Sequence, residues 1–319
     1  MYYRVLVTCP PMQKSIARYR EELAEKGLDV HCPTMTQVLA ETELMELVPR
    51  YDGWIIGDDP ATAQVFAAGA RGNLKAAVKW GVGIDNVDFE GAGMAGVPIT
   101  NTPGMFGDEV ADLAMSYVVA LARQTFLVNA GVWSGEWPKP VGISLKDKVA
   151  AVVGFGSIGQ ATAVRLLASK VKVHVYDPLY KGGSPLDAAV TFRAWAEEIG
   201  SADFIILCCS LTKANRHMLN AEILANCKPG VRIINVSRGP LIDEQALGSA
   251  LSSGAVHSAA LEVFDVEPLP EDSPLRKHQN CVFGSHNASN TQDAVDATSR
   301  LAIDLLAGFL ASRSLRQPD

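Results

Sequence analysis

Short uninterrupted apolar runs, rich in valine and isoleucine, alternate with helix-like stretches along almost the whole chain. Such runs are typical of parallel strands whose two faces are both covered by helices, because a strand with one wet face would alternate apolar and polar residues. One set of runs lies in the first hundred residues, and a second begins at residue 148. One open sheet rarely holds about eleven strands without splitting. The pattern therefore predicts an α/β fold with two doubly wound, Rossmann-like parallel sheets.

The first set of expected strands comprises RVLVTC, VHCPT, GWIIG, AAVKWG and PITNT, and the second comprises KVAAVVGFG, KVHVYDP, FIILCCS, VRIINVS, SAALEVF and NCVFGSH. Between the sets, apolar residues recur at helical spacing over residues 107–131, which predicts one long helix buried between domains or against another subunit. An arm rich in Gly, Pro and Trp follows it, and residues 290–313 are expected to form the last helix. We expect a homodimer through residues 107–145, because this apolar helix and arm need a partner surface.

Composition and charge exclude several functional classes. The 319 residues suit about two domains of ~150 residues each. The net charge of −7 gives no general attraction to nucleic acid or to an anionic membrane, and the apolar runs are far too short to span a bilayer. The six cysteines are spaced for neither a zinc site nor a disulfide framework. We therefore expect buried thiols, no metal, and a reducing, cytoplasmic compartment.

The stretch VVGFGSIGQ contains the pattern G-x-G-x-x-G at Gly154, Gly156 and Gly159. The pattern alone is weak, because 27 glycines in the chain will produce chance matches. Its context is specific: the buried run KVAAVVGFG precedes it and a helical stretch, SIGQATAVRLLAS, follows. Amide groups at such a strand–helix junction, together with the helix dipole, attract phosphate. The loop therefore predicts a dinucleotide site.

An acidic residue, Asp177, ends the next expected strand, VKVHVYDP, about 20 residues beyond the glycines. A carboxylate in this position can accept hydrogen bonds from the adenosine ribose hydroxyls and repels a 2′-phosphate. The cofactor is therefore expected to be NAD rather than NADP. A tight strand–helix turn followed by an exposed aspartate is the alternative interpretation.

Six motifs, in order along almost the whole chain, carry a resemblance to a known family: KWGVGIDNVD, NTPGMFGDEVAD, VVGFGSIGQ, INVSRGPLIDEQAL, ALEVFDVEPLP and FGSHNASNT. The sequence resembles the D-isomer-specific 2-hydroxyacid dehydrogenases, the group that includes phosphoglycerate dehydrogenase and glyoxylate reductase. The resemblance implies a flavodoxin-like substrate-binding domain, residues 1–101 plus 290–319, with an NAD-binding Rossmann domain, residues 102–289, inserted in it. It also implies an NAD-dependent oxidoreductase that interconverts a small 2-keto acid and the D-2-hydroxy acid by hydride transfer.

Three residues that follow strands are candidates for the chemistry. Arg238 follows the run VRIINVS, Glu267 lies just past SAALEVF, and His286 closes NCVFGSH. Ligands of doubly wound sheets bind beyond the carboxyl ends of the strands. There a guanidinium can grip a carboxylate, an imidazole can transfer a proton near neutral pH, and a carboxylate can favour the imidazolium and orient its ring. Each residue alone could be structural, but the resemblance places the family's catalytic arginine, glutamate and histidine on these positions.

The resemblance also implies the binding contacts. The substrate carboxylate would bind Arg238 and the backbone amides of Val82 and Gly83, with His286 as general acid or base and Lys79 available to neutralise a second anionic group. The cofactor contacts would come from Gly154, Gly156, Ser157, Ile158, Gly159, Asp177, Ser210, Thr212, Val236, Ser237 and Glu262.

Three positions depart from the family pattern near these contacts. Glu262 stands where an aspartate usually accepts a hydrogen bond from the nicotinamide carboxamide, and it is one methylene longer. Phe106 replaces a frequent asparagine, which removes a polar contact and can add an apolar wall. Ser210 replaces a common proline.

A fourth departure lies in the loop WIIGDDPAT, where phosphoglycerate-using relatives tend to place an arginine that holds phosphate. Here the loop has Gly57, Asp58 and Asp59. Two acids would repel a phosphate, which argues against 3-phosphoglycerate as the substrate. Alternatively, Asp58 and Asp59 are turn and helix-cap residues before PATAQVF.

Two other functions stay open at this point. A dinucleotide-sensing, corepressor-like binding protein would keep similar site residues, although the chain has no basic surface or long disordered tail typical of one. An NADP-preferring glyoxylate or hydroxypyruvate reductase would need a pocket near Asp177 that tolerates a 2′-phosphate. The identity of the 2-hydroxy acid and the physiological direction are not fixed by these residues.

Overall fold

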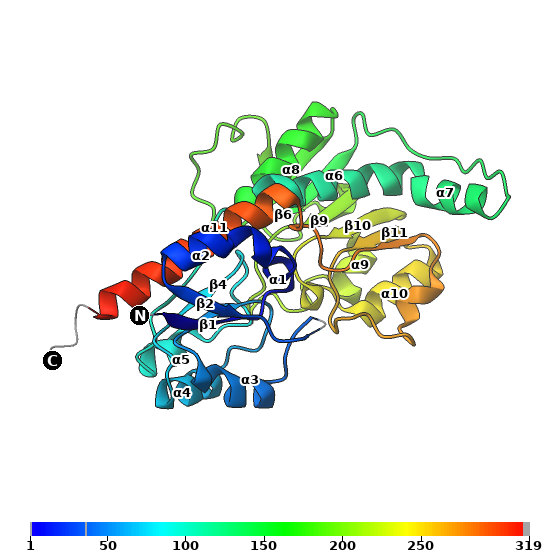
Figure 1. The fold of residues 1–319 in the computed structure, drawn as a ribbon. Helices are drawn as coiled ribbons and strands as arrows, with labels where there is room; N and C mark the ends of the chain where they lie inside the picture. The colour runs from blue at the N-terminus through cyan, green and yellow to red at the C-terminus, as the bar shows by residue number, and fades with distance from the viewer. Residues whose placement is uncertain (1, 36, 315–319) are drawn as a thin grey trace. The chain divides into compact units, whose positions relative to one another are not determined.

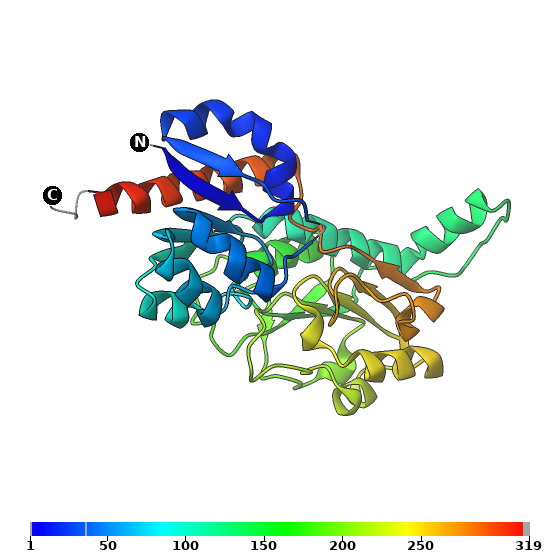
Figure 2. The ribbon, with the colours of Figure 1, turned by 60° about the horizontal axis from the view of Figure 1, so that its bottom comes forward.

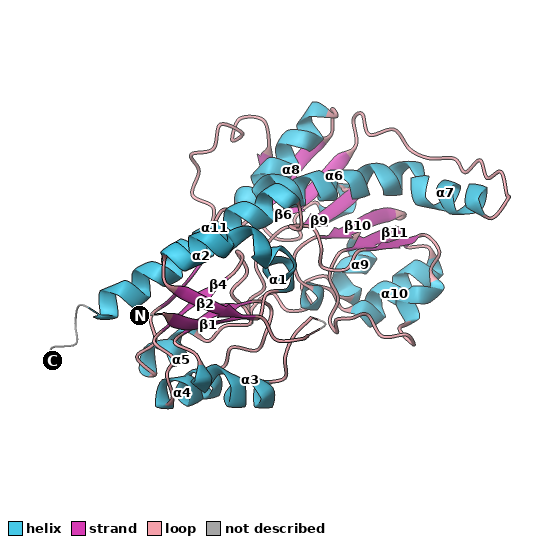
Figure 3. Ribbon diagram, viewed as in Figure 1, coloured by secondary structure: helices cyan, strands magenta, loops and turns pink. Residues whose placement is uncertain are grey.

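The computed structural model describes residues 2–35 and 37–314, and the chain divides into two compact units. Unit 1 consists of Met1–Phe106 and Asn290–Asp319, and unit 2 is the intervening segment Gly107–Ser289 (Figure 1). Each unit has its own fully parallel sheet with helices packed on it (Figure 3). The prediction of two doubly wound α/β domains is therefore confirmed.

The sheet of unit 1 has five strands in the order β2-β1-β3-β4-β5, the flavodoxin-like order. Its strands are β1 (Tyr3–Val7), β2 (Leu28–His31), β3 (Gly53–Ile56), β4 (Ala76–Lys79) and β5 (Ile99–Asn101). Its helices are α1 (Pro10–Ser15), α2 (Arg20–Glu25), α3 (Glu41–Leu47), α4 (Ala63–Arg71), α5 (Phe89–Met94) and α11 (Gln292–Ser314), with short 3-10 turns at Ile16–Tyr19 and Val48–Arg50.

Helices cover both faces of the unit 1 sheet, with α3, α4 and α5 on one face and α1, α2 and α11 on the other (Figure 2). On the first face, the rings of Trp54 and Phe66 lie 5.9 Å apart and are tilted by 52°, and both side chains are fully buried. On the second, Leu306 of α11 lies directly over Gly53, where a Cβ atom would come within 3.0 Å of the leucine. Trp80 Nε1 donates to Ser299 Oγ at 3.1 Å. The last helix of the chain thus completes the core begun by the first strands.

The sheet of unit 2 has seven strands in the order β12-β11-β10-β9-β6-β7-β8. The strands are β6 (Val149–Val153), β7 (Lys172–Tyr176), β8 (Thr191–Phe192), β9 (Phe204–Leu207), β10 (Val231–Asn235), β11 (Val256–Leu261) and β12 (Cys281–Phe283). The helices are α6 (Gly107–Arg123), α7 (Thr125–Trp133), α8 (Ser157–Ala168), α9 (Ala221–Asn226) and α10 (Glu244–Ser253), with 3-10 turns at Ile199–Ser201, Gly239–Leu241 and Pro274–Lys277. The two-residue strand β8 was not expected from the sequence.

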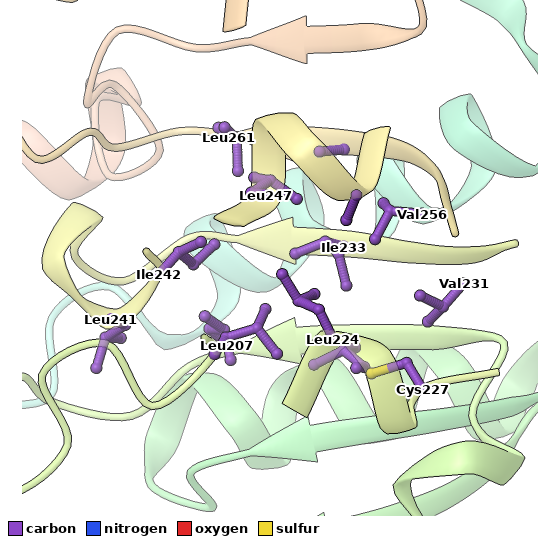
Figure 4. Packing of buried hydrophobic residues seen from close by; sticks show 14 of the residues in the cluster. Leu207, Leu224, Cys227, Val231, Ile233, Leu241, Ile242, Leu247, Val256 and Leu261 are labelled. Atoms are coloured by element: carbon purple, nitrogen blue, oxygen red, sulfur yellow. The ribbon is translucent and has the colours of Figure 1, made fainter. Parts of the chain in front are cut away.

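Branched apolar side chains from the central strands of unit 2 pack against two helices on one face (Figure 4). Leu207, Ile233 and Leu261 belong to β9, β10 and β11, and they meet Leu224 of α9 and Leu247 of α10 in one buried cluster. Helices α6 and α8 pack together, and α6 also contacts β10 and β11. Burial on both faces explains why these strands are uninterrupted apolar runs.

The expectation of a single long helix over residues 107–131 is wrong. Gln124 adopts a left-handed backbone with φ 54°, and α6 and α7 meet there at 70°. The cause lies about twenty residues further along: Ile143 N donates to Ala122 O at 2.8 Å and takes up a carbonyl at the end of α6. A Cβ atom on Gly142 would lie 2.6 Å from that same oxygen, so the returning chain closes the helix tightly. The apolar side of α6 is buried within its own unit.

The segment after the break is more exposed than α6. Trp133 at the end of α7 is 85% exposed, and Trp137 in the loop that follows is 77% exposed.

Over residues 2–35 and 37–314, no single helix has both the length and the apolar composition to cross a membrane, and α6 with α7 meets those criteria only as a bent pair.

Candidate active site

The loop between β6 and α8 contains three glycines, and a Cβ atom would have different surroundings at each of them. Gly154 has φ +92°, and a Cβ there would lie 2.6 Å from the backbone of Cys209. A Cβ on Gly159 would lie 2.0 Å from Gly154 O, so this glycine lets α8 pack against the loop. A Cβ on Gly156 would meet nothing within 4 Å. The space over Gly156, at the start of α8 with Ser157 and Ile158, therefore suits the approach of a dinucleotide phosphate.

Asp177 follows β7, the neighbour of β6, and its carboxylate is fixed beside the glycine loop. Its Oδ2 accepts from Phe155 N at 2.8 Å, and its Oδ1 accepts from Leu179 N and Tyr180 N at 2.9 and 3.2 Å. The side chain stays partly exposed. An oriented, partly exposed carboxylate in this place fits the predicted acceptor for ribose hydroxyls.

The other candidate cofactor contacts lie after β9 and β10, which are adjacent strands. Ser237 Oγ donates to Cys209 O, which joins the two loops, and Val236 is buried beneath them. The Thr212 backbone N–H and hydroxyl both donate to Asn215 Oδ1, at 2.7 and 3.0 Å, and Asn215 Nδ2 donates to Ser210 O at 2.8 Å. Asn215, which sequence reasoning missed, orders the loop after β9.

Arg238 stands directly after β10 in a turn that Asn235 organises. The Asn235 side chain accepts from Ser237 N at 3.0 Å and donates to Arg238 O at 2.8 Å. A Cβ on Gly239 would lie 1.9 Å from the carbonyl carbon of Phe264. The turn that carries Arg238 is therefore pressed against the turn after β11. The sequence signal for Asn235 is its place at the end of a strand, just before the arginine.

The structure brings Glu267 and His286 together. His286 Nδ1 lies 2.8 Å from Glu267 Oε2, with both side chains 25% exposed, and Glu267 Oε1 accepts from Phe264 N at 2.9 Å. These residues and Arg238 follow β10, β11 and β12, three neighbouring strands whose carboxyl ends share one edge. A carboxylate at this distance orients the imidazole and favours its protonated form. The arrangement can transfer a proton next to a group that binds carboxylates.

Glu262, the first residue after β11, is buried, with only 1% of its surface exposed. Its Oε2 accepts from the Tyr117 hydroxyl at 2.5 Å, and its Oε1 accepts from Asn287 N. Burial, together with the neighbouring carboxylate, raises the pKa of Tyr117 well above its ordinary range, so the hydroxyl stays a donor. Sequence reasoning missed Tyr117, although a tyrosine in a buried helix face needs a hydrogen-bond partner.

In unit 1, the loop after β4 contains the candidate substrate amides. Gly81 has φ +114°, and its N–H donates to Thr102 Oγ1 at 2.7 Å, while Asn101 Nδ2 donates to Val82 O at 3.2 Å. The backbone N–H groups of Val82 and Gly83 donate to no residue in the part of the chain that the structure describes. Two such amides in a partly exposed, fixed loop can bind an anion.

Lys79, at the end of β4, is already paired. It is 3% exposed, and its Nζ donates to Gly57 O at 2.6 Å and to Asp58 Oδ1 at 3.0 Å. The Asp58 side chain is 40% exposed, so this surface presents a carboxylate over a buried ammonium. Phe106, whose role was open, is buried with its ring 5.4 Å from that of Trp80.

Asp59 is not the cap of the helix at PATAQVF. Thr62 caps α4 by accepting from Val65 N, whereas Asp59 is fully buried and accepts from Leu39 N at 2.9 Å. Its other oxygen has no hydrogen-bond partner among residues 2–35 and 37–314, and burial raises the pKa of Asp59. The sequence could not show this because Leu39 is distant along the chain.

All six cysteines are free thiols, of which Cys9 and Cys227 are buried. Among the described residues, no group of three or more His, Cys, Asp or Glu side chains is arranged to hold a metal ion.

Residues 115–288 match the family model described as D-isomer specific 2-hydroxyacid dehydrogenase, NAD binding domain. A hydroxypyruvate reductase from Thermotoga maritima is 36% identical over 274 residues, which cover 84% of this chain and 87% of the relative. D-3-phosphoglycerate dehydrogenase 2, chloroplastic, from Arabidopsis thaliana is 33% identical over 311 residues, which cover 94% of this chain but 49% of the relative, so the chain spans about half of that protein.

The fold is also similar to solved structures. The crystal structure of the TT0316 protein from Thermus thermophilus superimposes with a TM-score of 0.85 at 32% identity, covering 97% of both chains. The matched residues belong to both units.

Proposed function

This chain belongs to the D-isomer specific 2-hydroxyacid dehydrogenases, and from that premise we propose that it works as a reductase of a small 2-keto acid whose proton donor is His286. Members of the family are NAD-dependent oxidoreductases that interconvert 2-keto acids and D-2-hydroxy acids, and this chain is one of them. The observation that carries the proposal is the 2.8 Å contact between His286 Nδ1 and Glu267 Oε2. Glu267 follows β11, which lies between β12, the strand before His286, and β10, the strand before Arg238.

The residues at the carboxyl edge of the unit 2 sheet divide the work. When bound, the reduced nicotinamide supplies a hydride for the keto carbon. The Arg238 guanidinium binds the substrate carboxylate and polarises the keto oxygen. Imidazolium at His286 gives its Nε2 proton to that oxygen, and in oxidation the neutral ring takes the proton back. The Val82 and Gly83 amides are the donors that unit 1 offers to an anion.

Glu267 keeps the His286 ring oriented and protonated while substrate binds. Its second oxygen is held by Phe264 N, which stops the carboxylate from rotating away. In Glu267→Gln, the imidazolium loses its counter-charge. The kcat of reduction should then fall, because the ring has lost both its counter-charge and the acceptor that orients it.

The test is NADH oxidation over a panel of 2-keto acids, including glyoxylate, hydroxypyruvate, pyruvate and phosphohydroxypyruvate. We expect rapid turnover of at least one acid, and a loss of ~10²–10⁴-fold in kcat in His286→Ala with NADH affinity, measured by fluorescence, unchanged. NADH binding without turnover of any acid, or full turnover in His286→Ala, would contradict the proposal.

We propose further that the substrate has no second anionic group. The support is the pairing of Lys79 with Asp58, which uses the ammonium internally and leaves a carboxylate on the surface. Such a surface repels a phosphate group on the substrate. It tolerates a hydrogen atom or a hydroxymethyl group attached to the keto carbon. Hydroxypyruvate and glyoxylate meet this requirement, and the name of the Thermotoga relative agrees with it.

Asp58→Asn tests this selectivity. Without the carboxylate, Lys79 can attract an anion, so kcat/KM for phosphohydroxypyruvate should rise at least about tenfold relative to hydroxypyruvate, a change of ~1.4 kcal/mol. Asp29→Asn, at an exposed position of β2, makes the same change in net charge and is expected to leave the ratio as it is. Wild-type preference for phosphohydroxypyruvate would overturn the proposal.

The homodimer and the compartment are also proposals. Large apolar side chains are exposed on α7 and the following loop, namely Phe126, Val132, Trp133, Trp137 and Val141. Several large apolar side chains exposed on one segment are typical of an interface, and a second copy of this chain is the partner we propose. Six free thiols fit a reducing compartment, and we propose the cytoplasm, which fractionation of cells would test.

A further inference from the structure

The buried Glu262 carboxylate has no oxygen left without a donor from the protein. Tyr117 of α6 donates to Oε2 and Asn287 N donates to Oε1. The family resemblance assigns this position to hydrogen bonding with the nicotinamide carboxamide. A side chain one methylene shorter would withdraw the carboxylate from Tyr117, so the longer glutamate matches a partner on α6.

The main chain of Glu262 joins the two loops that contain the proposed catalytic residues. Its carbonyl oxygen accepts from His286 N at 2.8 Å, and its N–H donates to Asn235 O at 2.9 Å. Asn235 in turn fixes the carbonyl of Arg238. Glu262 therefore holds the segment of His286 twice, through its carbonyl and through its carboxylate on Asn287.

The segment that Glu262 holds needs such support. His286 has φ 54°, a left-handed conformation that costs a non-glycine residue free energy and persists only where the surroundings enforce it. Gly284, two residues earlier, makes room for the clamp: a Cβ there would lie 1.8 Å from Glu262 Oε2 and 2.8 Å from the Tyr117 hydroxyl. The Glu262 carboxylate and the Tyr117 hydroxyl therefore occupy the space that a side chain on residue 284 would need.

We propose that Tyr117 and Glu262 form a positioning pair that fixes the left-handed backbone at His286, and thereby the direction of its imidazole, instead of binding the cofactor's carboxamide. The proposal rests on the role of His286 given above. Neither residue touches the reacting atoms. They act through the loop at residues 284–287.

The experiment compares Tyr117→Phe with Tyr19→Phe. Tyr19 is also a buried tyrosine whose hydroxyl donates to a carboxylate, Asp296 Oδ1, at 2.8 Å, but it belongs to unit 1. We expect Tyr117→Phe to lower kcat about tenfold or more, because small misplacements of a catalytic group are costly. The dissociation constant of NADH, measured by fluorescence, should stay within about twofold of the wild type. Tyr19→Phe should leave kcat as it is, even if it lowers the thermal midpoint.

A cofactor analogue separates positioning from carboxamide binding. The 3-acetylpyridine analogue of NADH lacks the carboxamide nitrogen, so a residue that accepts from this nitrogen would matter only with NADH. For Tyr117→Phe, we expect kcat to fall by the same factor with NADH as with the analogue, and we expect the same of Glu262→Asp. In both variants the alkaline fall of the pH profile should move to lower pH. A loss confined to NADH, or a raised NADH dissociation constant with unchanged kcat, would overturn the proposal.

The outcome also distinguishes this proposal from the one on which it rests. If His286→Ala abolishes turnover while Tyr117→Phe and Glu262→Asp turn over normally, only the positioning role fails. If His286→Ala itself turns over normally, the proposed proton donor fails first.

Discussion

Gly239 shows how single residues determine the geometry of this site. It follows Arg238, and any side chain on it would overlap the backbone of Phe264 and Asp265, in the turn that leads to Glu267. The close contact between these two turns therefore depends on the absence of one Cβ atom.

Gly239→Ala should destabilise unit 2 by about 3 kcal/mol, at the upper end for overpacking, and should lower kcat because the two turns must separate. Gly248→Ala is the matched control: Gly248 is buried in α10, and a Cβ atom there would meet nothing within 4 Å, so alanine should stabilise the helix by ~0.5–1 kcal/mol. Thermal unfolding and kcat of both variants check this. Equal stability of the two would contradict the contact.

Asp59 makes stability depend on pH in unit 1. Burial raises its pKa in the folded state above the unfolded value of about 4. Between these values the folded state binds more protons, so the contribution of Asp59 to stability is fully present below about pH 4 and is lost as pH rises through the folded pKa. The unfolding free energy of the wild type, relative to Asp59→Asn, should therefore fall as pH increases from about 4.

Urea-unfolding midpoints of the two proteins, measured in steps of pH, test the direction. The exposed Asp29→Asn serves as the control and should follow the wild type at every pH. A wild type that gains stability relative to Asp59→Asn as pH rises would mean that the Asp59 pKa is lowered on folding, not raised.

At the scale of elements, two glycines at the junction of β6 and α8 are expected to have different roles. One allows α8 to pack, and the other allows the cofactor to bind. In Gly159→Ala the new methyl group would push α8 off the loop, so the thermal midpoint should fall. In Gly156→Ala nothing in the protein obstructs the methyl group, so the midpoint should hold while NADH affinity falls about tenfold or more, since the phosphate must approach this backbone. Calorimetry and NADH fluorescence measure the two effects. A stable Gly156→Ala variant with wild-type affinity would show that the dinucleotide does not lie over this glycine.

The sequence predicted elements well wherever local pattern and burial agree. Most strands coincide with apolar runs because both faces of each sheet are covered. The strand β2 (Leu28–His31) begins two residues before the expected run VHCPT and ends at His31, and β8, two residues long, left too little pattern to find. The single helix over 107–131 failed for the opposite reason. Helical spacing continues through Gln124, and the break is made by Ile143 and Gly142, whose contact with Ala122 no local window contains.

The residues of the candidate site divide in the same way, into those that a local pattern predicts and those that depend on distant contacts. Strand-end positions could be found from motifs, so Arg238, Glu267 and His286 were all named in advance, and their roles stay predictions. Side chains that reach across elements could not be found: Tyr117 lies 145 positions from Glu262 along the chain. The pairing of Lys79 with Asp58 was likewise invisible, because charge patterns do not tell which ions meet.

For the whole molecule, the surface of α7 and its loop predicts the oligomeric state. The protein should sediment as a homodimer, and Trp133→Ser with Trp137→Ser should raise the dimer dissociation constant more than about tenfold, because interface tryptophans often contribute ~2 kcal/mol or more. Met94→Ser removes an equally exposed apolar side chain from unit 1 and should leave the dimer intact. A monomeric wild-type protein at assay concentration would end this proposal.

Unit 1 is interrupted in the chain, and this has a consequence for its synthesis. Its five strands leave the ribosome early, whereas α11, whose Leu306 and Ser299 cover Gly53 and Trp80, leaves after all of residues 107–289. At about 5–20 residues per second, the delay is roughly 10 to 40 s. During that interval α1 and α2 are the only helices available to the face that α11 completes, so part of its apolar surface stays exposed. Unit 2 is therefore the part that can complete its fold first, and the growing chain is the state that exposes the most apolar surface to a chaperone.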